Sequence, residues 1–274
     1  EFQGASSLSS DGSWMTYTPQ NSGLLNHRVL AVSFAPDGCL WFGHVTGISV
    51  MSPESNWFTA SKEGLDYWDL EVNSIEFEQD GTAWLVAWPD GVYRVRPDGE
   101  VAALYTPYNS PVGLGIGFAI DRDGCKWFAN DGGIQMLDAA NENWTCYGPE
   151  DSGMLGFWVG CAKVDKQNRK WFSSSEGVAV LDDDGNWSRY TAEEMGMDDD
   201  DSYVWDIEFD RDGRVWFATL YCGVRILNTD GTWTGYKSID SGLSNDYVTD
   251  ILIDGQNRKW FASSFGGLAL LVED

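Results

Sequence analysis

Short runs of alternating apolar and polar residues fill the chain, and turn residues separate these runs at nearly constant intervals. The stretch VWDIEFDRDGRVWFATLYCGVRILNTDGTWTGYK contains four runs rich in β-branched and aromatic residues: VWDIEF, RVWFAT, GVRIL and TWTGYK. Asp212-Gly213 separates the first two runs and Asp230-Gly231 the last two, and such dipeptides accept the positive φ angles of tight hairpins. The pattern therefore predicts four short antiparallel strands, with helical periodicity nearly absent.

One part of this stretch, the motif around its central tryptophan, recurs along the whole chain. Its variants are CLWFGHVTGI, TAWLVAWPDGV, CKWFANDGGI, RKWFSSSEGV, RVWFATLYCGV and RKWFASSFGGL, and their tryptophans are Trp41, Trp84, Trp127, Trp171, Trp216 and Trp260. Successive tryptophans are thus 43 to 45 residues apart. Six copies of a four-stranded antiparallel unit at this period predict an all-β fold, a six-bladed β-propeller.

The two ends of the chain predict how the ring closes. DGSWMTYTPQNSGLLNHRV begins at Asp11, and the similar DGTWTGYKSIDSGLSNDYV begins at Asp230, so the first copy follows an orphan fourth strand. The last copy stops after its third strand, GLALLVED. We therefore expect residues 13–18 to pair with residues 267–272, so that the N-terminal strand completes the last blade and removes two sheet edges. We expect residues 11–274 to form one domain and residues 1–10 to be a disordered or cloning-derived leader.

Composition narrows the class of partner. The chain has 43 acidic and 17 basic residues and a net charge of −26, which repels nucleic acid and anionic lipid. No apolar run is long enough to span a membrane. Its five cysteines show no metal-binding spacing. The expected partner is a neutral or cationic small molecule, sugar or peptide, bound by a monomer.

The repeat resembles that of a known family. The pattern D-x-x-G-x-x-W-F-a-t-x-x-G-[VL], with TxY and SGLxNxxV between copies, is similar to the two-component regulator propeller repeat over essentially all of the chain after about residue 10. Many such proteins are extracellular sensor regions of bacterial hybrid kinases that bind carbohydrate-derived signals. The resemblance implies a propeller, a sensing role, and an extracellular or periplasmic location.

Most of the fifteen tryptophans are explained by the repeat. Six define the second strand, and five others begin fourth strands: Trp14, Trp57, Trp144, Trp187 and Trp233. The remaining four are Trp68, Trp88, Trp158 and Trp205. Propeller topology places these four on one face, at the mouth of the channel, together with Tyr203, Tyr221, Tyr247, Phe157, Tyr67 and Phe265. A one-sided group of aromatic residues outside the repeat predicts a ligand-binding site.

Carboxylates are predicted at the same mouth. Counting back ten residues from the repeat tryptophans reaches Asp206 and Asp250, and counting back eleven reaches Asn73 and Trp205; Glu71 lies nearby. These carboxylates could cap backbone NH groups around a water-filled channel, receive an organic cation, or bind calcium. Six-bladed gluconolactonases and paraoxonases, a more distant resemblance, hold calcium with such side chains. Glu71, Asn73, Asp206 and Asp250 are the corresponding candidate ligands.

Only two histidines occur, His27 and His44, both in the first copy on the mouth side. They are the candidate general acid or base, although a single histidine near a loop is more often structural. Three functional classes therefore stay open. The favoured one is a sensor-like or lectin-like binding module, and the alternatives are a calcium-dependent hydrolase of lactones or phosphotriesters and a protein-interaction scaffold.

Overall fold

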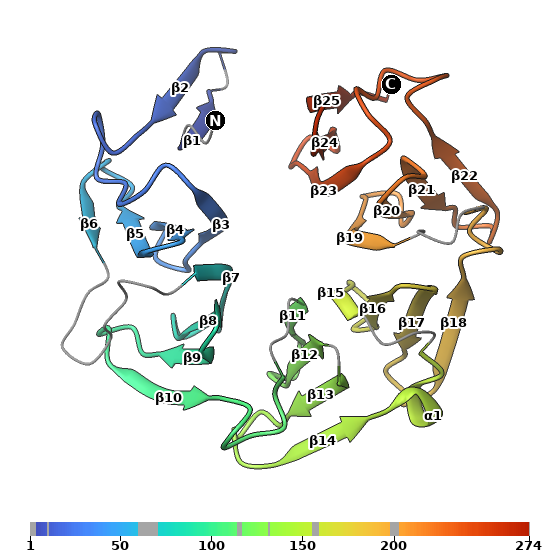
Figure 1. The fold of residues 1–274 in the computed structure, drawn as a ribbon, viewed down its shortest axis with the longest axis horizontal. Helices are drawn as coiled ribbons and strands as arrows, with labels where there is room; N and C mark the ends of the chain where they lie inside the picture. The colour runs from blue at the N-terminus through green and yellow to red at the C-terminus, as the bar shows by residue number, and fades with distance from the viewer. Residues whose placement is uncertain are drawn as a thin grey trace. The chain divides into compact units, whose positions relative to one another are not determined.

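The chain has the predicted all-β fold of a six-bladed propeller, built from four-stranded antiparallel sheets. The structure is a computed structural model that describes residues 4–9, 11–59, 71–113, 117–130, 132–154, 159–197 and 203–273. It divides into two units, Glu1–Ile116 and Gly117–Asp274, which we call unit 1 and unit 2 and describe separately (Figure 1).

The described part of unit 1 forms three antiparallel sheets. A two-stranded sheet contains β1 (Ala5–Leu8) and β2 (Trp14–Tyr17). The first four-stranded sheet contains β3 (Val29–Phe34), β4 (Leu40–His44), β5 (Gly47–Met51) and β6 (Trp57–Thr59). The second contains β7 (Glu71–Phe77), β8 (Ala83–Trp88), β9 (Gly91–Val95) and β10 (Val101–Tyr105).

Unit 2 continues the series with three four-stranded sheets and one three-stranded sheet among its described residues. The first four-stranded sheet contains β11 (Gly117–Ile120), β12 (Lys126–Asn130), β13 (Gly133–Leu137) and β14 (Trp144–Tyr147). The second contains β15 (Val159–Val164), β16 (Lys170–Ser174), β17 (Gly177–Leu181) and β18 (Trp187–Thr191). The third contains β19 (Val204–Phe209), β20 (Val215–Thr219), β21 (Val224–Leu227) and β22 (Trp233–Tyr236). The last sheet contains β23 (Val248–Ile253), β24 (Lys259–Ser263) and β25 (Gly267–Leu271), and one short helix, α1 (Pro149–Ser152), follows β14. The first strands of neighbouring sheets, β11, β15, β19 and β23, contact one another in turn, and β14, β18 and β22 form the opposite edges of their sheets (Figure 1).

One hydrogen bond explains why an aspartate and a tryptophan recur together in the repeat. In the last sheet but one, Trp216 is fully buried and its Nε1 donates to Oδ2 of Asp210 at 3.0 Å. The other Oδ atom of Asp210 accepts the backbone N–H groups of Asp212 and Arg214. One carboxylate therefore fixes both the hairpin turn and the core indole, and the same bond joins Trp127 to Asp121, Trp171 to Asp165 and Trp260 to Asp254.

Buried lysines join neighbouring sheets of unit 2. Lys170 in β16 places its Nζ 3.5 Å from Asp121 in the preceding sheet, and Lys259 in β24 places its Nζ 3.9 Å from Asp210. Both ammonium groups also lie over the tryptophan of the preceding sheet, at 5.7 and 5.2 Å from the ring centroid. Since an unpaired buried charge is costly, each of these lysines ties its sheet to the one before it.

The predicted pairing of residues 13–18 with residues 267–272 is wrong for this structure. β2 pairs with β1, in the register Leu8↔Trp14 and Ala5↔Tyr17, and β25 pairs only with β24 among the described residues. Residues 4–8 form this strand because they repeat the third-strand pattern: Gly4 has φ 97°, and a Cβ there would lie 2.0 Å from the carbonyl oxygen of Tyr17. Gly91 at the start of β9 has the same relation to Tyr105, at 2.1 Å. The nearby partner closes a short loop at lower entropic cost, so Ala5–Leu8 is a strand rather than part of a disordered leader.

Candidate functional site

A β-bulge recurs at one position of the first strands and sets the direction of the predicted site residues. The pairing register shifts between Val72 and Ser74 in β7, between Val204 and Asp206 in β19, and between Val248 and Asp250 in β23. The residues skipped by these shifts are Asn73, Trp205 and Thr249, and β3 and β15 shift at the corresponding position. A bulge turns a side chain away from the regular alternation of a strand. The residues eleven positions before the repeat tryptophans therefore differ from the rest of their strands in backbone pairing as well as in side-chain type.

Two neighbouring first strands of unit 2 bring carboxylates and a lysine together. Nζ of Lys163, in β15, lies 3.3 Å from Oδ1 of Asp206 and 2.8 Å from Oε1 of Glu208, both in β19. The second oxygen of Asp206 accepts the backbone N–H of Ile251 in β23 at 3.1 Å. Asp206 therefore links three consecutive sheets of the unit, which explains why this position carries a carboxylate.

Asp250 completes this group, which we call the acidic cluster: Lys163, Asp206, Glu208 and Asp250. Crowding by protein atoms and the neighbouring Asp206 carboxylate raise the pKa of Asp250 to about 7, although its side chain keeps contact with solvent. Burial likewise raises the pKa of Glu208, against the opposing effect of Lys163. Burial alone would lower the pKa of Lys163, but Asp206 and Glu208 raise it well above its usual value. At neutral pH the cluster carries a permanent cation and a carboxyl group close to its titration midpoint.

The predicted calcium ligands fall into two pairs. Asp206 and Asp250 lie in unit 2, and Glu71 and Asn73 lie in unit 1, at β7. The ammonium group of Lys163 stands where a cation bound by Asp206 would have to approach, and the described residues contain no group of three or more acidic, histidine or cysteine side chains with the geometry of a metal site. Asp206 and Asp250 thus do not fit a calcium site as they stand, because Ca²⁺ needs six to eight oxygen ligands.

Five of the predicted aromatic residues do come together. Tyr203 contacts Trp205 edge to face at a centroid distance of 4.7 Å, and Trp205 stacks on Tyr247 at 6.2 Å. Tyr247 in turn contacts Tyr221 at 5.7 Å and Phe265 at 6.1 Å. We call these five residues the aromatic row. Phe265 is 84% exposed and Tyr221 50% exposed, so one end of the row lies open to solvent.

The inner end of the row carries an unused donor. The Trp205 indole Nε1 is buried and has no hydrogen-bond partner among the residues that the structure describes. Trp205 immediately precedes Asp206, so the row begins beside the acidic cluster. Gly160 in β15 makes room for the Tyr203 ring, because a Cβ at Gly160 would lie 1.7 Å from the Tyr203 hydroxyl oxygen. Burial raises the pKa of Tyr203 to about 12, which keeps its hydroxyl protonated.

The remaining predictions concern unit 1 and the undescribed segments. Trp88, at the end of β8, is 55% exposed and faces Glu71 across the β7–β8 pair, while Arg28 approaches Glu71 at 3.6 Å. His44 is buried rather than exposed, its Nε2 lies 2.9 Å from the Ser49 hydroxyl, and burial lowers its pKa to about 4. It is therefore uncharged at neutral pH. The structure places the Nε2 of His27, the other histidine, 3.1 Å from the Gln20 amide. The predicted residues Trp68 and Trp158 lie outside the described residues.

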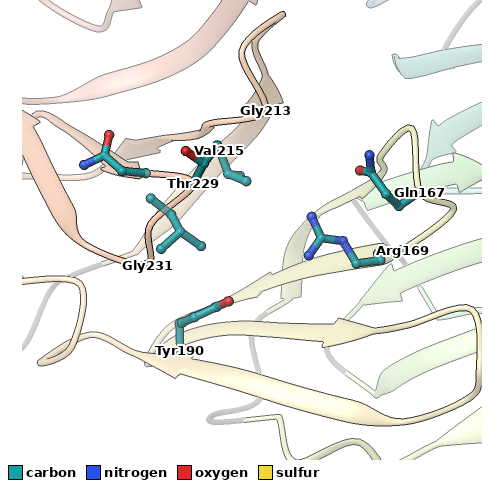
Figure 2. Close-up of a pocket in the computed structure, with 9 residues that line it drawn as sticks. Gln167, Arg169, Tyr190, Gly213, Val215, Thr229 and Gly231 are labelled. Atoms are coloured by element: carbon teal, nitrogen blue, oxygen red, sulfur yellow. The ribbon is translucent and has the colours of Figure 1, made fainter.

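A second surface feature is a groove between neighbouring sheets of unit 2. Figure 2 shows Gln167, Arg169 and Tyr190 on one side and Gly213, Val215, Thr229 and Gly231 on the other. Its volume is about 470 Å³. Arg169 already has partners within the protein: its Nε donates to Asp165 at 2.6 Å, and its guanidinium lies 5.0 Å from the centroid of the Trp171 ring. The groove lies on the side of the tight turns and contains no member of the aromatic row or the acidic cluster.

Sequence reasoning missed Lys163 and Glu208. Both lie two residues beyond a position reached by counting back ten, namely Cys161 and Asp206. Residues two apart along a strand share a face, so this alternation was a usable signal. A comparison of single positions between copies does not reveal that charges on adjacent strands compensate one another.

Comparison with known proteins supports the fold and the resemblance of the repeat. Residues 199–221 match the family model described as "Two component regulator propeller", which confirms the repeat type that the sequence indicated. A comparison with curated protein sequences gives no match.

Several solved structures share the fold. The extracellular domain of a hybrid two-component system from Bacteroides thetaiotaomicron has a TM-score of 0.80 at 18% identity, over 95% of this chain and 35% of that chain. PorZ, a surface component of the type-IX secretion system of Porphyromonas gingivalis, has a TM-score of 0.68 at 18% identity, over 96% of this chain and 42% of that chain. Virginiamycin B lyase from Staphylococcus aureus has a TM-score of 0.66 at 15% identity, over 89% of this chain and 84% of that chain. This chain therefore spans about a third of the first of these proteins, and identities this low establish the fold alone.

Within the described residues, no helix has both the length and the apolar character needed to cross a bilayer.

Proposed function

We propose that the protein is a ligand-binding propeller of the sensor type, and that unit 2 binds a neutral or cationic small molecule, a sugar or a short peptide. One observation carries the proposal: five aromatic rings outside the repeat contact one another in series and begin beside the acidic cluster. Exposed aromatic surface next to convergent polar groups is the usual composition of a small-ligand site.

The chemistry of the site favours some ligands over others. The faces of Trp205 and Tyr247 can bind the apolar face of a sugar ring or attract a cation. Three carboxyl groups and one lysine make the acidic cluster net negative even while Asp250 is protonated, and ionisation of Asp250 adds a further negative charge, which disfavours anions. The buried Trp205 N–H offers a hydrogen bond to a ligand oxygen.

An extracellular or periplasmic location belongs to the same proposal. Two of the similar structures are extracellular domains of B. thetaiotaomicron signalling proteins, and another is a bacterial surface component. A sensor reads small molecules outside the cell, which agrees with the open aromatic row. The calcium-dependent hydrolase receives no support from the geometry of Asp206, whose oxygens already have partners.

The test is a binding screen with matched variants. The chain is screened by calorimetry against a panel of neutral glycans, amino sugars and organic amines, together with Trp205→Ala, Asp250→Asn and the control Phe34→Ala. Phe34 is 73% exposed but lies outside the site. We expect a ligand whose affinity falls about tenfold or more with Trp205→Ala and is unchanged with Phe34→Ala. If every ligand found binds Trp205→Ala as tightly as the original chain, the proposed site is wrong.

A further inference from the structure

The groove in Figure 2 lies between the β15–β18 sheet and the β19–β22 sheet, and three of the positions that line it carry short side chains. These are Gly213 in the turn before β20, Val215 at the start of β20, and Thr229 two residues after β21. Leu227 and the Tyr190 ring add apolar surface. The volume of about 470 Å³ is in the range of small-ligand sites.

The next pair of sheets carries longer side chains at the same three positions: Asn257, Lys259 and Glu273. The Glu273 carboxylate has two cationic partners there. Its Oε1 accepts a hydrogen bond from Nη1 of Arg214 at 3.0 Å, and its Oε2 accepts one from Nη2 of the same arginine. Nζ of Lys259 also donates to Oε2, at 2.5 Å. The two oxygens therefore bind the guanidinium in the bidentate geometry that carboxylates favour.

The preceding pair of sheets also places a carboxylate at this position of the repeat. Asp183 stands two residues after β17, as Glu273 stands two residues after β25. Its Oδ1 accepts from Nδ2 of Asn168 at 2.7 Å and lies 3.8 Å from Nζ of Lys170, and its Oδ2 accepts from Arg122 at 3.0 Å. In the junctions before and after the groove, the protein thus supplies its own carboxylate.

Arg169 is the counterpart of Arg214 but lacks such a carboxylate. Its Nε donates to Asp165 as the Nε of Arg214 donates to Asp210, both at 2.6 Å. Thr229 occupies the position of the carboxylate, and Nη1 and Nη2 of Arg169 have no acceptor among the residues that the structure describes. The Arg169 side chain is 39% exposed against 22% for Arg214, and Figure 2 shows its guanidinium directed into the groove.

We propose that this groove binds a small organic carboxylate, whose two oxygens contact Nη1 and Nη2 of Arg169 as those of Glu273 contact Arg214. A guanidinium presents its donors in one plane and therefore matches a planar carboxylate better than a single acceptor atom. The ligand takes the place of the internal carboxylate of the neighbouring junctions. This site is separate from the aromatic row and the acidic cluster, so it does not depend on the function proposed above.

The other lining residues define the body of the ligand. Tyr190, Val215 and Leu227 supply apolar surface, and Asn228 adds an uncharged polar group. The Tyr190 ring is held in place by a stacked contact with Trp171 at a centroid distance of 6.0 Å. A monocarboxylate with a compact aromatic or aliphatic body fits this lining, whereas the net charge of −26 repels a multiply charged anion more strongly.

The test is a ligand-observed NMR titration with benzoate, hexanoate, benzamide and phosphate at about 0.15 M salt, where a Debye length of about 8 Å limits repulsion by distant charges. We expect the two carboxylates to bind with dissociation constants on the order of 1 mM, because they are small. Benzamide has the shape of benzoate without its charge, and phosphate is tetrahedral, so both should bind about tenfold more weakly or less. Equal binding of benzoate and benzamide would overturn the carboxylate as the recognised group.

Thr229→Glu supplies the internal carboxylate that the neighbouring junctions have. Its side chain should bind the terminal nitrogens of Arg169, abolish benzoate binding, and raise the melting temperature by about 2 °C or more. Ser188→Glu is the matched control, because Ser188 is exposed on β18 outside the groove lining and the added charge is the same. It should leave the affinity and the melting temperature nearly unchanged. A Thr229→Glu protein that binds benzoate as tightly as the parent would overturn the site.

Arg169→Lys changes the other half of the contact. Lysine keeps a cation near the buried Asp165, so the variant should fold, but it loses the planar pair of donors. Benzoate should therefore bind about tenfold more weakly than to the parent. Unchanged affinity in this variant, or a parent protein that binds neither carboxylate, would overturn the proposal. None of these variants touches the aromatic row or the acidic cluster, so the result is independent of the other ligand site.

Discussion

Lys163 and Asp206 lie on adjacent first strands of unit 2, with 3.3 Å between Nζ and Oδ1. The Lys163 ammonium group is therefore a cation within the site. It lies on one sheet and balances the charge of the Asp206 carboxylate on the neighbouring sheet. Glu208 shares the same ammonium group at 2.8 Å. The electrostatic behaviour of the site therefore depends on Lys163.

Lys163→Met should destabilise the protein by about 1 to 3 kcal/mol near neutral pH, a range reduced from that of fully buried pairs because the Lys163 side chain is 36% exposed. The loss arises because Asp206 and Glu208 keep their charges without a partner. It should shrink at about pH 4, where the unpaired carboxylates accept protons. Urea unfolding at both pH values measures the effect. Lys166→Met, at an exposed neighbouring position, is the control and should change little.

Asp250→Asn should stabilise the protein at alkaline pH. The pKa of Asp250 is raised from 3.8 to about 7, so the folded state binds its proton more tightly than the unfolded state does. The stabilisation linked to this proton is complete below about pH 4 and is lost as pH rises through about 7. The variant carries no ionisable group there, so its melting temperature should match that of the parent at about pH 4 and exceed it at about pH 8.

The comparison for this prediction is Asp184→Asn, which removes an exposed carboxylate from a turn. Its melting temperature should follow the parent at both pH values. Identical pH profiles for Asp250→Asn and the parent would show that Asp250 titrates near its ordinary pKa.

Asn168→Ala should destabilise the protein by about 2 to 4 kcal/mol. Asn168 is buried with φ 63°, its Oδ1 accepts the backbone N–H of Arg122, and its Nδ2 donates to Asp123 and Asp183. Alanine loses these bonds and also strains the left-handed backbone. Asn168→Gly loses the bonds but relieves the strain, so denaturant midpoints should rank the parent first, glycine second and alanine last. The reverse order of the two variants would argue against a backbone contribution.

Gly160→Ala should disturb the aromatic row while leaving the fold in place. The added methyl group would lie 1.7 Å from the Tyr203 hydroxyl oxygen, and the Tyr203 side chain can move away at modest cost. Because Tyr203 contacts Trp205, we expect a change in near-ultraviolet circular dichroism, weaker ligand binding, and a stability change within about 1 kcal/mol. In a Tyr203→Leu background the same glycine substitution should have a smaller effect. Equal effects in the two backgrounds would mean that Gly160 acts through another contact.

The repeat period was sufficient to predict the propeller, because each Asp-to-Trp bond and each Asp-Gly turn is encoded within a few residues. It also placed Tyr203, Trp205, Tyr221 and Tyr247 together, since topology alone carries loop residues to one side of the sheets. The closing strand was predicted wrongly because Gly4 and the strand after it match the third-strand pattern, and a local hairpin competes with a distant edge. The sequence did not predict the role of Lys163, because that role depends on Asp206 in the next copy of the repeat, 43 residues further on.

In unit 2, turn amides and buried lysines of one sheet contact the sheet before it. Asn168 receives the backbone of Arg122 and Asn257 that of Arg211, while Lys170 and Lys259 reach back to Asp121 and Asp210. Neighbouring sheets of this unit are therefore not independent building blocks. Shortening, lengthening or grafting such an array should keep a sheet that carries a buried lysine together with the sheet before it, because a cut between them leaves an ammonium group in the core without its carboxylate.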